Sequence, residues 1–203
     1  MPVLALTTVD RVKAYLGTSN SGAAVGVWSP ENVAVLQDMI NKVSDDMENY
    51  CNRSFGLQSY TTETLLTGPV MQVDSVPVQS ITSIVGTASG RGSDMATIPA
   101  TAYDISADGD SITFYTLGRG ARVRAVYVGG LAATTADIIA NYPALAGACD
   151  MQVANLWKRH ANPDKTGMTL GNGQTNWTQE YQMLTDVKRT LDNSFLYMAD
   201  FLG

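Results

Sequence analysis

His160 is the only histidine of the chain and therefore the first residue to test for acid–base chemistry. A histidine base needs a nucleophile beside it, and the sequence contains no G-x-S-x-G motif that would present a serine. His160 instead follows Lys158 and Arg159 at the end of a predicted helix, where cationic side chains favour the negative end of the helix dipole. We interpret it as a helix-terminal residue and expect no catalytic site.

The strongest metal-site candidate is the segment from Asp104 to Asp110, which begins like an EF-hand calcium loop with the spacing D-x-S-x-D-G. Tyr115 occupies the twelfth position, where such a loop supplies a bidentate Glu. The flanking residues resemble strands, and Asp-Gly provides the positive φ angles of a tight turn. A β-hairpin is the favoured interpretation, calcium binding is the alternative, and we expect no metal or cofactor.

Arg119, Arg122 and Arg124 form a local basic cluster. The last two share one face of their strand, because side chains alternate along a strand. Such a patch could contact DNA or an acidic partner. With three arginines and no interleaved aromatic residues, a solvated strand face or a subunit salt bridge is favoured over a nucleic-acid site. We keep the three residues as a hypothetical channel or salt-bridge patch.

The bulk composition limits the classes of function. The 203 residues are 45% hydrophobic, which suits one ordinary domain, and the net charge of −6 disfavours general binding to phosphate backbones. Cys51 and Cys149 belong to no C-x-x-C pair, so we expect buried, reduced thiols. No signal peptide or membrane span is predicted, and we expect the chain to be made in a reducing cytoplasm.

The hydrophobic spacing predicts an α+β fold. Helical periodicity favours a small bundle, and period-two alternation with many Thr, Val, Ile and Tyr residues favours an antiparallel β module inserted at about 58–128. Thr7 to Asp10 has the form of a helix start, and Ser29-Pro30-Glu31 supplies three start signals for the second helix. The helices are predicted at about 8–16, 30–51, 143–160 and 178–202.

Four stretches, taken in order, resemble the head-to-tail connector (head-completion adaptor) family of tailed bacteriophages. They are LTTVDRVKAYLG, VLQDMINKVSDDMENYCNRSF, SVPVQSITSI, and VRAVYVGGL followed by the helix PALAGACDMQVANLWKRH. Together they cover about half of the chain in the order of the family. The resemblance implies one connector domain over residues 1–203 that is structural rather than enzymatic.

The resemblance also implies partners and a location. We expect self-assembly into a ring of about twelve copies at the virion neck, formed by head-to-tail contacts that close by rotation. The ring would lie between the portal protein and a tail or stopper protein, extend the DNA channel without binding DNA specifically, and be assembled in the host cytoplasm. A DNA-packaging or DNA-binding accessory protein is the alternative function, and a small calcium-dependent enzyme is a third.

The terminal segment 178–203 is predicted to be a docking helix. A helix of about 25 residues spans roughly 37 Å, more than a domain of this size needs for its own core. Part of it is therefore expected to contact another protein. We expect Leu191, Phe195, Met198 and Phe201 to dock on the portal or on the next subunit.

Overall fold

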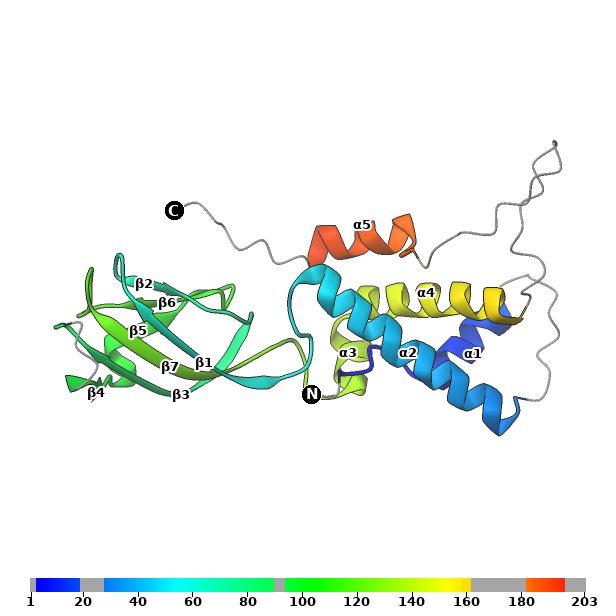
Figure 1. Cartoon of the computed structure of the whole chain (residues 1–203), viewed down its shortest axis with the longest axis horizontal. Coiled ribbons are helices and arrows are strands. Elements are labelled where there is room, and N and C mark those ends of the chain that lie inside the picture. The colour runs from blue at the N-terminus through cyan, green and yellow to red at the C-terminus, as the bar shows by residue number, and fades with distance from the viewer. Residues whose placement is uncertain (1–2, 19–27, 90–93, 162–181, 196–203) are drawn as a thin grey trace. The chain divides into compact units, whose positions relative to one another are not determined.

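The computed structural model describes residues 3–18, 28–89, 94–161 and 182–195. The chain divides into a helical unit, Met1–Asn52 with Thr134–Gly203, and a β module, Arg53–Ala133, inserted between its helices (Figure 1). This confirms the predicted α+β class with an antiparallel insert. No helix in these ranges is long and apolar enough to cross a membrane.

The helices agree with the prediction in most places. The described ones are α1 (Val9–Thr18), α2 (Pro30–Cys51), α3 (Thr135–Asn141), α4 (Pro143–Ala161) and α5 (Thr185–Ser194). The predictions at 8–16, 30–51 and 143–160 match α1, α2 and α4 within two residues. The short helix α3 was not predicted. Of the predicted helix 178–202, the structure shows α5 alone. The prediction is wrong for residues 182–184, which are not helical because Gln152 takes the backbone groups of Gln182 and Leu184, and residues 178–181 and 196–202 lie outside the described residues.

Helix α2 follows from local signals at both ends. The Asn32 N–H donates to the Ser29 hydroxyl oxygen at 3.2 Å, and Pro30 opens the helix. Asn52 ends it in the left-handed conformation, with φ at 50°, and donates its N–H to the Asn49 carbonyl. One face is fully buried in the helical core: Leu36, Ile40, Val43, Met47 and Cys51.

Helix α1 begins one residue later than its sequence suggests. The residue before it is Thr8, whose hydroxyl oxygen accepts from the Arg11 N–H at 3.4 Å. The expected cap, Thr7, is buried and donates its hydroxyl to the buried carboxylate of Asp150 on α4. Arg11 also binds this carboxylate, with Nη2 at 2.8 Å. The Thr7 hydroxyl therefore forms a tertiary hydrogen bond with Asp150 instead of capping α1 as the local sequence pattern predicted.

The β module contains two antiparallel sheets. One has the order β1-β7-β3-β4 and the other the order β2-β6-β5. The strands are β1 (Gln58–Leu65), β2 (Val70–Gln72), β3 (Val78–Thr87), β4 (Ala96–Thr97), β5 (Tyr103–Ile105), β6 (Ser111–Phe114) and β7 (Arg122–Gly129). The central strand β7 pairs with both β1 and β3 and alternates buried and less buried residues.

The buried Tyr127 of β7 ties the larger sheet to the segment after β2. Its hydroxyl oxygen accepts from the backbone N–H groups of Asp74 at 2.9 Å and Ser75 at 3.1 Å. A buried phenol needs such partners, because an unpaired polar atom in a core costs free energy. Tyr127 therefore fixes the path of the chain between β2 and β3.

The predicted hairpin at Asp108-Gly109 is confirmed. It joins β5 to β6, and Gly109 has a φ of 66°. Ser106 accepts the Asp110 N–H and donates its hydroxyl to the Asp110 carboxylate at 2.5 Å. The Ser111 hydroxyl donates to the same carboxylate oxygen at 2.9 Å. These hydrogen bonds from Ser106 and Ser111 lower the pKa of Asp110 and make its carboxylate part of the turn itself.

The base of the β module, defined as residues 55–57 and 130–132, brings the entering and leaving chains together. Leu57 donates its N–H to the Ala132 carbonyl at 2.9 Å, and the Ala132 N–H donates to the Phe55 carbonyl at 3.1 Å. Gly130 has a φ of +127°, and a Cβ there would lie 2.4 Å from the Gly56 oxygen. Only glycine allows this close approach of the two backbones.

Candidate functional site

The tip of the β module, defined as residues 65–70 and 115–122, is the end where β1 stops and β7 starts. Its two loops are held together by backbone hydrogen bonds. Gly120 donates to the Leu66 carbonyl, Leu66 donates to the Ala121 carbonyl, and Phe114 donates to the Pro69 carbonyl, each at 2.8 Å. The two loops therefore lie side by side at this end of the module.

Large apolar side chains are exposed at this tip. Tyr115 is 64% exposed, Leu65 59% and Val70 41%. In the described ranges the one other large hydrophobic residue with such exposure is Tyr15, on α1. Apolar side chains that gather on a surface and are bordered by charge are typical of protein–protein contacts. The tip is thus the best candidate for an interaction site.

A carboxylate bound by two arginines borders this apolar surface. Glu63 of β1 lies opposite Arg124 of β7, and Arg122 lies two residues before it. One oxygen of Glu63 binds the Arg122 guanidinium, with Nη2 at 2.6 Å and Nε at 2.7 Å, while the other binds the Nε and Nη2 of Arg124 at 2.6 Å. The hydrogen bond from Arg124, followed by that from Arg122, lowers the pKa of Glu63.

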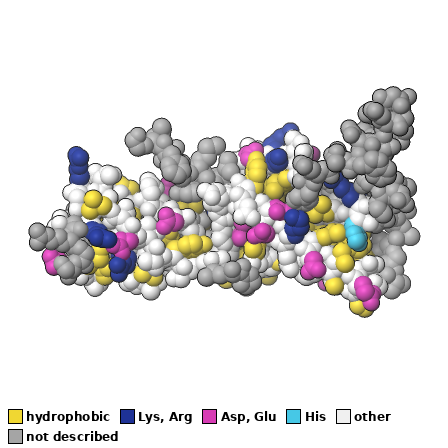
Figure 2. All heavy atoms as spheres, in the orientation of Figure 1, with side chains coloured by type: hydrophobic (Ala, Val, Ile, Leu, Met, Phe, Trp, Pro, Cys, Tyr) yellow, Lys and Arg dark blue, Asp and Glu magenta, His cyan; other side chains and the backbone are white. Residues whose placement is uncertain are grey.

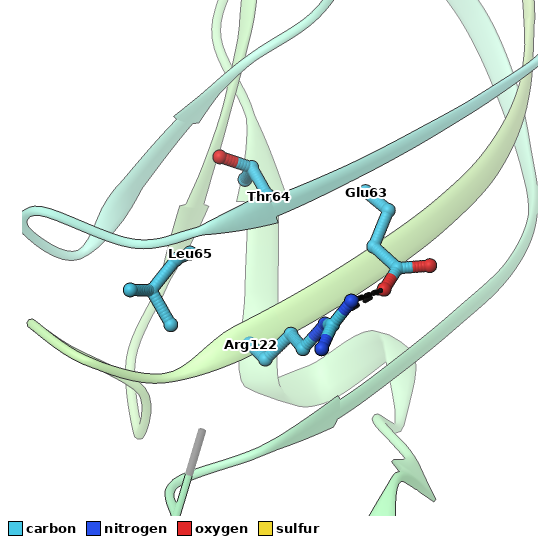
Figure 3. A pocket seen from close by; sticks show the side chains of 4 residues that line it. All are labelled: Glu63, Thr64, Leu65 and Arg122. Carbon is cyan, nitrogen blue, oxygen red and sulfur yellow. Dashed lines mark hydrogen bonds and ion pairs between the residues drawn. The ribbon is translucent and has the colours of Figure 1, made fainter. Parts of the chain in front are cut away.

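Figure 3 shows the contact of Glu63 with Arg122 near Leu65, an exposed residue of the tip. Glu63, Thr64, Leu65 and Arg122 line a solvent-open hollow of about 310 Å³. It combines one carboxylate, one guanidinium and one exposed leucine. Such a lining suits a side chain from another macromolecule, whereas small-molecule sites are usually enclosed and largely apolar.

The sequence-predicted arginine patch is divided by the structure. Arg122 and Arg124 lie on the outer face of β7 and share Glu63 in a salt bridge within the chain, whereas the sequence pattern suggested a solvated strand face or a salt bridge between subunits. Arg119 is exposed in the turn before β7 and forms no ion pair with the residues that the structure describes. Figure 2 shows that basic, acidic and apolar side chains are intermixed over this module.

The residues considered for chemistry lie apart from one another. His160 is in the last turn of α4 with Lys158 and Arg159, as predicted, and its ring centroid is 5.7 Å from that of Trp157. Both cysteines are buried thiols, and burial raises the pKa of Cys149 to about 12. Within the described ranges, no three His, Cys, Asp or Glu side chains gather as metal ligands would.

The predicted docking stripe on the last helix has a different environment from the one expected. Leu191 is 0% exposed and Phe195 is 7% exposed, and the Phe195 ring packs edge-on against Tyr142 at 6.3 Å between centroids. Their apolar surface is covered within the helical unit, so docking through them would require α5 to leave this position. Met198 and Phe201 lie outside the described residues.

Comparison with known proteins gives matches at the level of structure. No family model and no curated protein matches the chain. A chain from "Virion of native gene transfer agent (GTA) particle" has 14% sequence identity and a TM-score of 0.53, covering 93% of this chain and 91% of that one. At this identity the likeness shows a shared fold.

Two further matches come from structures of a particle neck. A chain of "Neck of empty GTA particle computed with C6 symmetry" has 13% identity, a TM-score of 0.49 and coverage of 89% and 87% of the two chains. A chain of "Neck of native GTA particle computed with C12 symmetry" has 14% identity, a TM-score of 0.47 and coverage of 77% and 81%.

Proposed function

We propose that this chain is a structural subunit of a phage neck, a head-to-tail connector that assembles into a ring. The observation that carries the proposal is the fold shared with a chain of a virion over 93% of the present sequence. Gene transfer agents are phage-like particles. The four ordered sequence stretches support the same family independently, because they concern residue types rather than backbone shape.

In this proposal the protein acts by binding neighbours rather than by catalysis. The features that support it are the exposed tip of the β module, the burial of both thiols, and the position of His160 at a helix end. Its partners are further copies of itself in a ring of about twelve, the portal on one side, and a tail or stopper protein on the other. Assembly takes place in the host cytoplasm.

DNA passes through the proposed ring without being held. The net charge of −6 opposes phosphate binding, and Glu63 already pairs with Arg122 and Arg124. The alternative function, a DNA-packaging or DNA-binding accessory protein, depends on these arginines and Arg119. Salt-dependent binding of duplex DNA by the free subunit separates the two. Tight binding that falls steeply with salt favours the accessory protein, and weak binding supports a passive channel wall.

The neck assignment is tested by removing the gene and imaging the particles. We expect DNA-filled heads that lack tails, with density missing below the portal vertex, and expression of the chain in trans restores both. Purified complete particles should show ring density there into which the helical unit and the β module fit. Particles that assemble normally without the gene, or complete particles without this chain at the neck, overturn the assignment.

We propose a docking role only for the last residues of the terminal segment 178–203. We propose that Met198 and Phe201 contact the portal or the next subunit, since Leu191 and Phe195 are covered in the helical unit. Met198→Ser with Phe201→Ser should reduce co-sedimentation with portal-bearing heads. Asn193→Ala, an exposed change on α5, serves as the control. Unchanged co-sedimentation of the double variant contradicts the proposed contact.

A further inference from the structure

The tip of the β module combines exposed apolar side chains with the exposed guanidinium of Arg119. Leu65, Val70 and Tyr115 supply the apolar surface. Arg119 is exposed and forms no ion pair with another described residue, whereas Arg122 and Arg124 share Glu63. Asp94, which precedes the short strand β4, and Asp104 of β5 are the other carboxylates near this end among the described residues. A partner surface should therefore be acidic, with small apolar side chains between its charges.

The helical unit of the same chain has this character. It carries thirteen of the 19 acidic residues and eight of the 13 Lys and Arg residues. On α2, Glu31, Asp38 and Asp45 are exposed and spaced by seven residues, so they follow one line along the helix. None of these three forms an ion pair with another residue in the described ranges.

Small apolar side chains lie on the same face of α2. Ala34 is exposed and Val35 is half-buried, and they stand three and four residues after Glu31 and before Asp38. The side chain of Leu65 or Tyr115 could pack between these acids while Arg119 meets one of them. Lys42 lies on this face too, and it pairs with Asp46 at 3.4 Å. The outer face of α2, defined as Glu31, Ala34, Val35, Asp38 and Asp45, is thus complementary to Arg119 in charge and to the tip in apolar content.

We propose that the tip of the β module of one copy docks on the outer face of α2 of the next copy. The inference rests on the proposed function, because such a contact joins two different surfaces and repeats around a closed ring. Each copy offers one tip and one α2 face, so every contact in the ring is the same. A second copy is favoured over a foreign partner because both complementary surfaces belong to this one chain.

The experiment exchanges charges across the proposed contact. Arg119→Glu places a carboxylate against the acids of α2, and Asp38→Arg places a guanidinium against the arginines of the tip. Each change alone should weaken assembly of the full-length chain, alone or on portal-bearing heads, by about tenfold or more. The double variant should regain assembly. A one-to-one mixture of the single variants should too, since alternating copies then pair opposite charges at every contact.

Matched controls reverse exposed charges elsewhere. Arg189→Glu on α5 and Asp10→Arg on α1 should assemble like the wild type. Leu65→Ser with Tyr115→Ser should weaken assembly without changing the circular dichroism spectrum. Native mass spectrometry and negative-stain imaging measure the assembled fraction.

Several outcomes overturn the inference. They are single variants that assemble like the wild type, a double variant or a mixture that regains nothing, or a wild-type chain that never self-associates. The failure of this contact is distinguishable from the failure of the neck assignment. Rings that persist at the neck in all of the variants refute the contact alone, whereas complete particles without the chain refute the assignment itself.

Discussion

The side chain of Gln152 on α4 serves as the hydrogen-bond partner of the backbone that leads into α5. Its carbonyl oxygen accepts the Leu184 N–H at 2.9 Å, and its amide donates to the Gln182 carbonyl at 3.4 Å. Leu184 precedes α5 directly, and Gln152 is fully buried. One side chain therefore satisfies two backbone groups and holds the start of α5 against α4.

Gln152→Met keeps the size of the side chain and removes both hydrogen bonds. We expect a loss of about 1–3 kcal/mol in the free energy of unfolding, because the Leu184 N–H loses its partner. Faster amide exchange over residues 184–195 should accompany it. Gln182→Met, at an exposed position, is the control and should change little. Equal stability of Gln152→Met and the wild type contradicts the role given to this amide.

Asp150→Asn tests the connection between α1 and α4. The change weakens the ion pair with Arg11 and the hydrogen bond from Thr7. We expect a loss of roughly 2–3 kcal/mol in urea unfolding, less than for a fully buried pair because the Arg11 side chain is 37% exposed. Asp10→Asn is the matched control, since Asp10 is 96% exposed and lies 3.9 Å from Lys13. If both variants lose the same free energy of unfolding, the contacts of Asp150 do not stabilise the fold more than an exposed aspartate does.

Glu63 should make the stability of the β module depend on pH. Its folded-state pKa lies below the ordinary value of 4.5, so the stabilisation is complete above that value and is lost as the pH falls through the folded pKa. The difference in melting temperature between the wild type and Glu63→Gln should be constant at neutral pH and shrink toward zero in acid. Gln72→Ala, an exposed and uncharged change on β2, is the control and should show no such trend. A difference in melting temperature that grows on acidification would contradict a lowered pKa of Glu63.

Gly130→Ala should disrupt the base of the β module. A Cβ there meets the Gly56 oxygen at 2.4 Å, and the φ of +127° is unfavourable for alanine. We expect a loss of at least about 1–3 kcal/mol in thermal or chemical unfolding. Gly118→Ala is the control, because its Cβ would meet nothing within 4 Å, and it should stay within about 0.5 kcal/mol of the wild type. A Gly130→Ala protein as stable as this control would show that the base is not tightly closed.

The buried thiols should be chemically silent in the folded protein. Burial raises the pKa of Cys149 to about 12, so almost no thiolate is present at neutral pH, and Cys51 is also fully buried. We expect a thiol reagent to titrate no cysteine at pH 8 in the native state and two after denaturation. In the Cys51→Ser variant, one cysteine should react with the reagent after denaturation. Rapid labelling of the native chain would place a cysteine at the surface instead.

Helices and turns were predictable where local signals specify them. Ser29 and Pro30 start α2, and Asp108-Gly109 turns the β5–β6 hairpin, and each of these interactions lies within a few residues in sequence. The missed helix α3 has only seven residues, too few for a clear apolar period. Its capping box, Thr134 with Asp137, was present in the sequence and would have located its start.

The site depends on contacts that no local pattern contains. Glu63 meets Arg122 and Arg124 because β1 lies beside β7, and the two arginines are 59 and 61 residues away in the sequence. Leu65 and Tyr115 belong to alternating segments that predict strands, and alternation does not say which strand end is left uncovered. Leu191 is buried where the sequence suggested docking. The helical spacing of apolar residues around it predicted a face that must be covered, but not whether the same chain or another protein covers it.

The closed base of the β module also determines how readily the β module can be replaced by another insertion. Phe55 and Leu57 bond to the leaving chain near Ala132, so the two connecting backbones run a strand's width apart. Because the two ends of the insertion lie close together, the entropic cost of connecting α2 to α3 resembles that of a short loop. Replacement of the insertion by a different module, or by a few residues, is therefore expected to leave the hydrophobic core of the helices intact while it exchanges the exposed apolar and charged side chains of the tip.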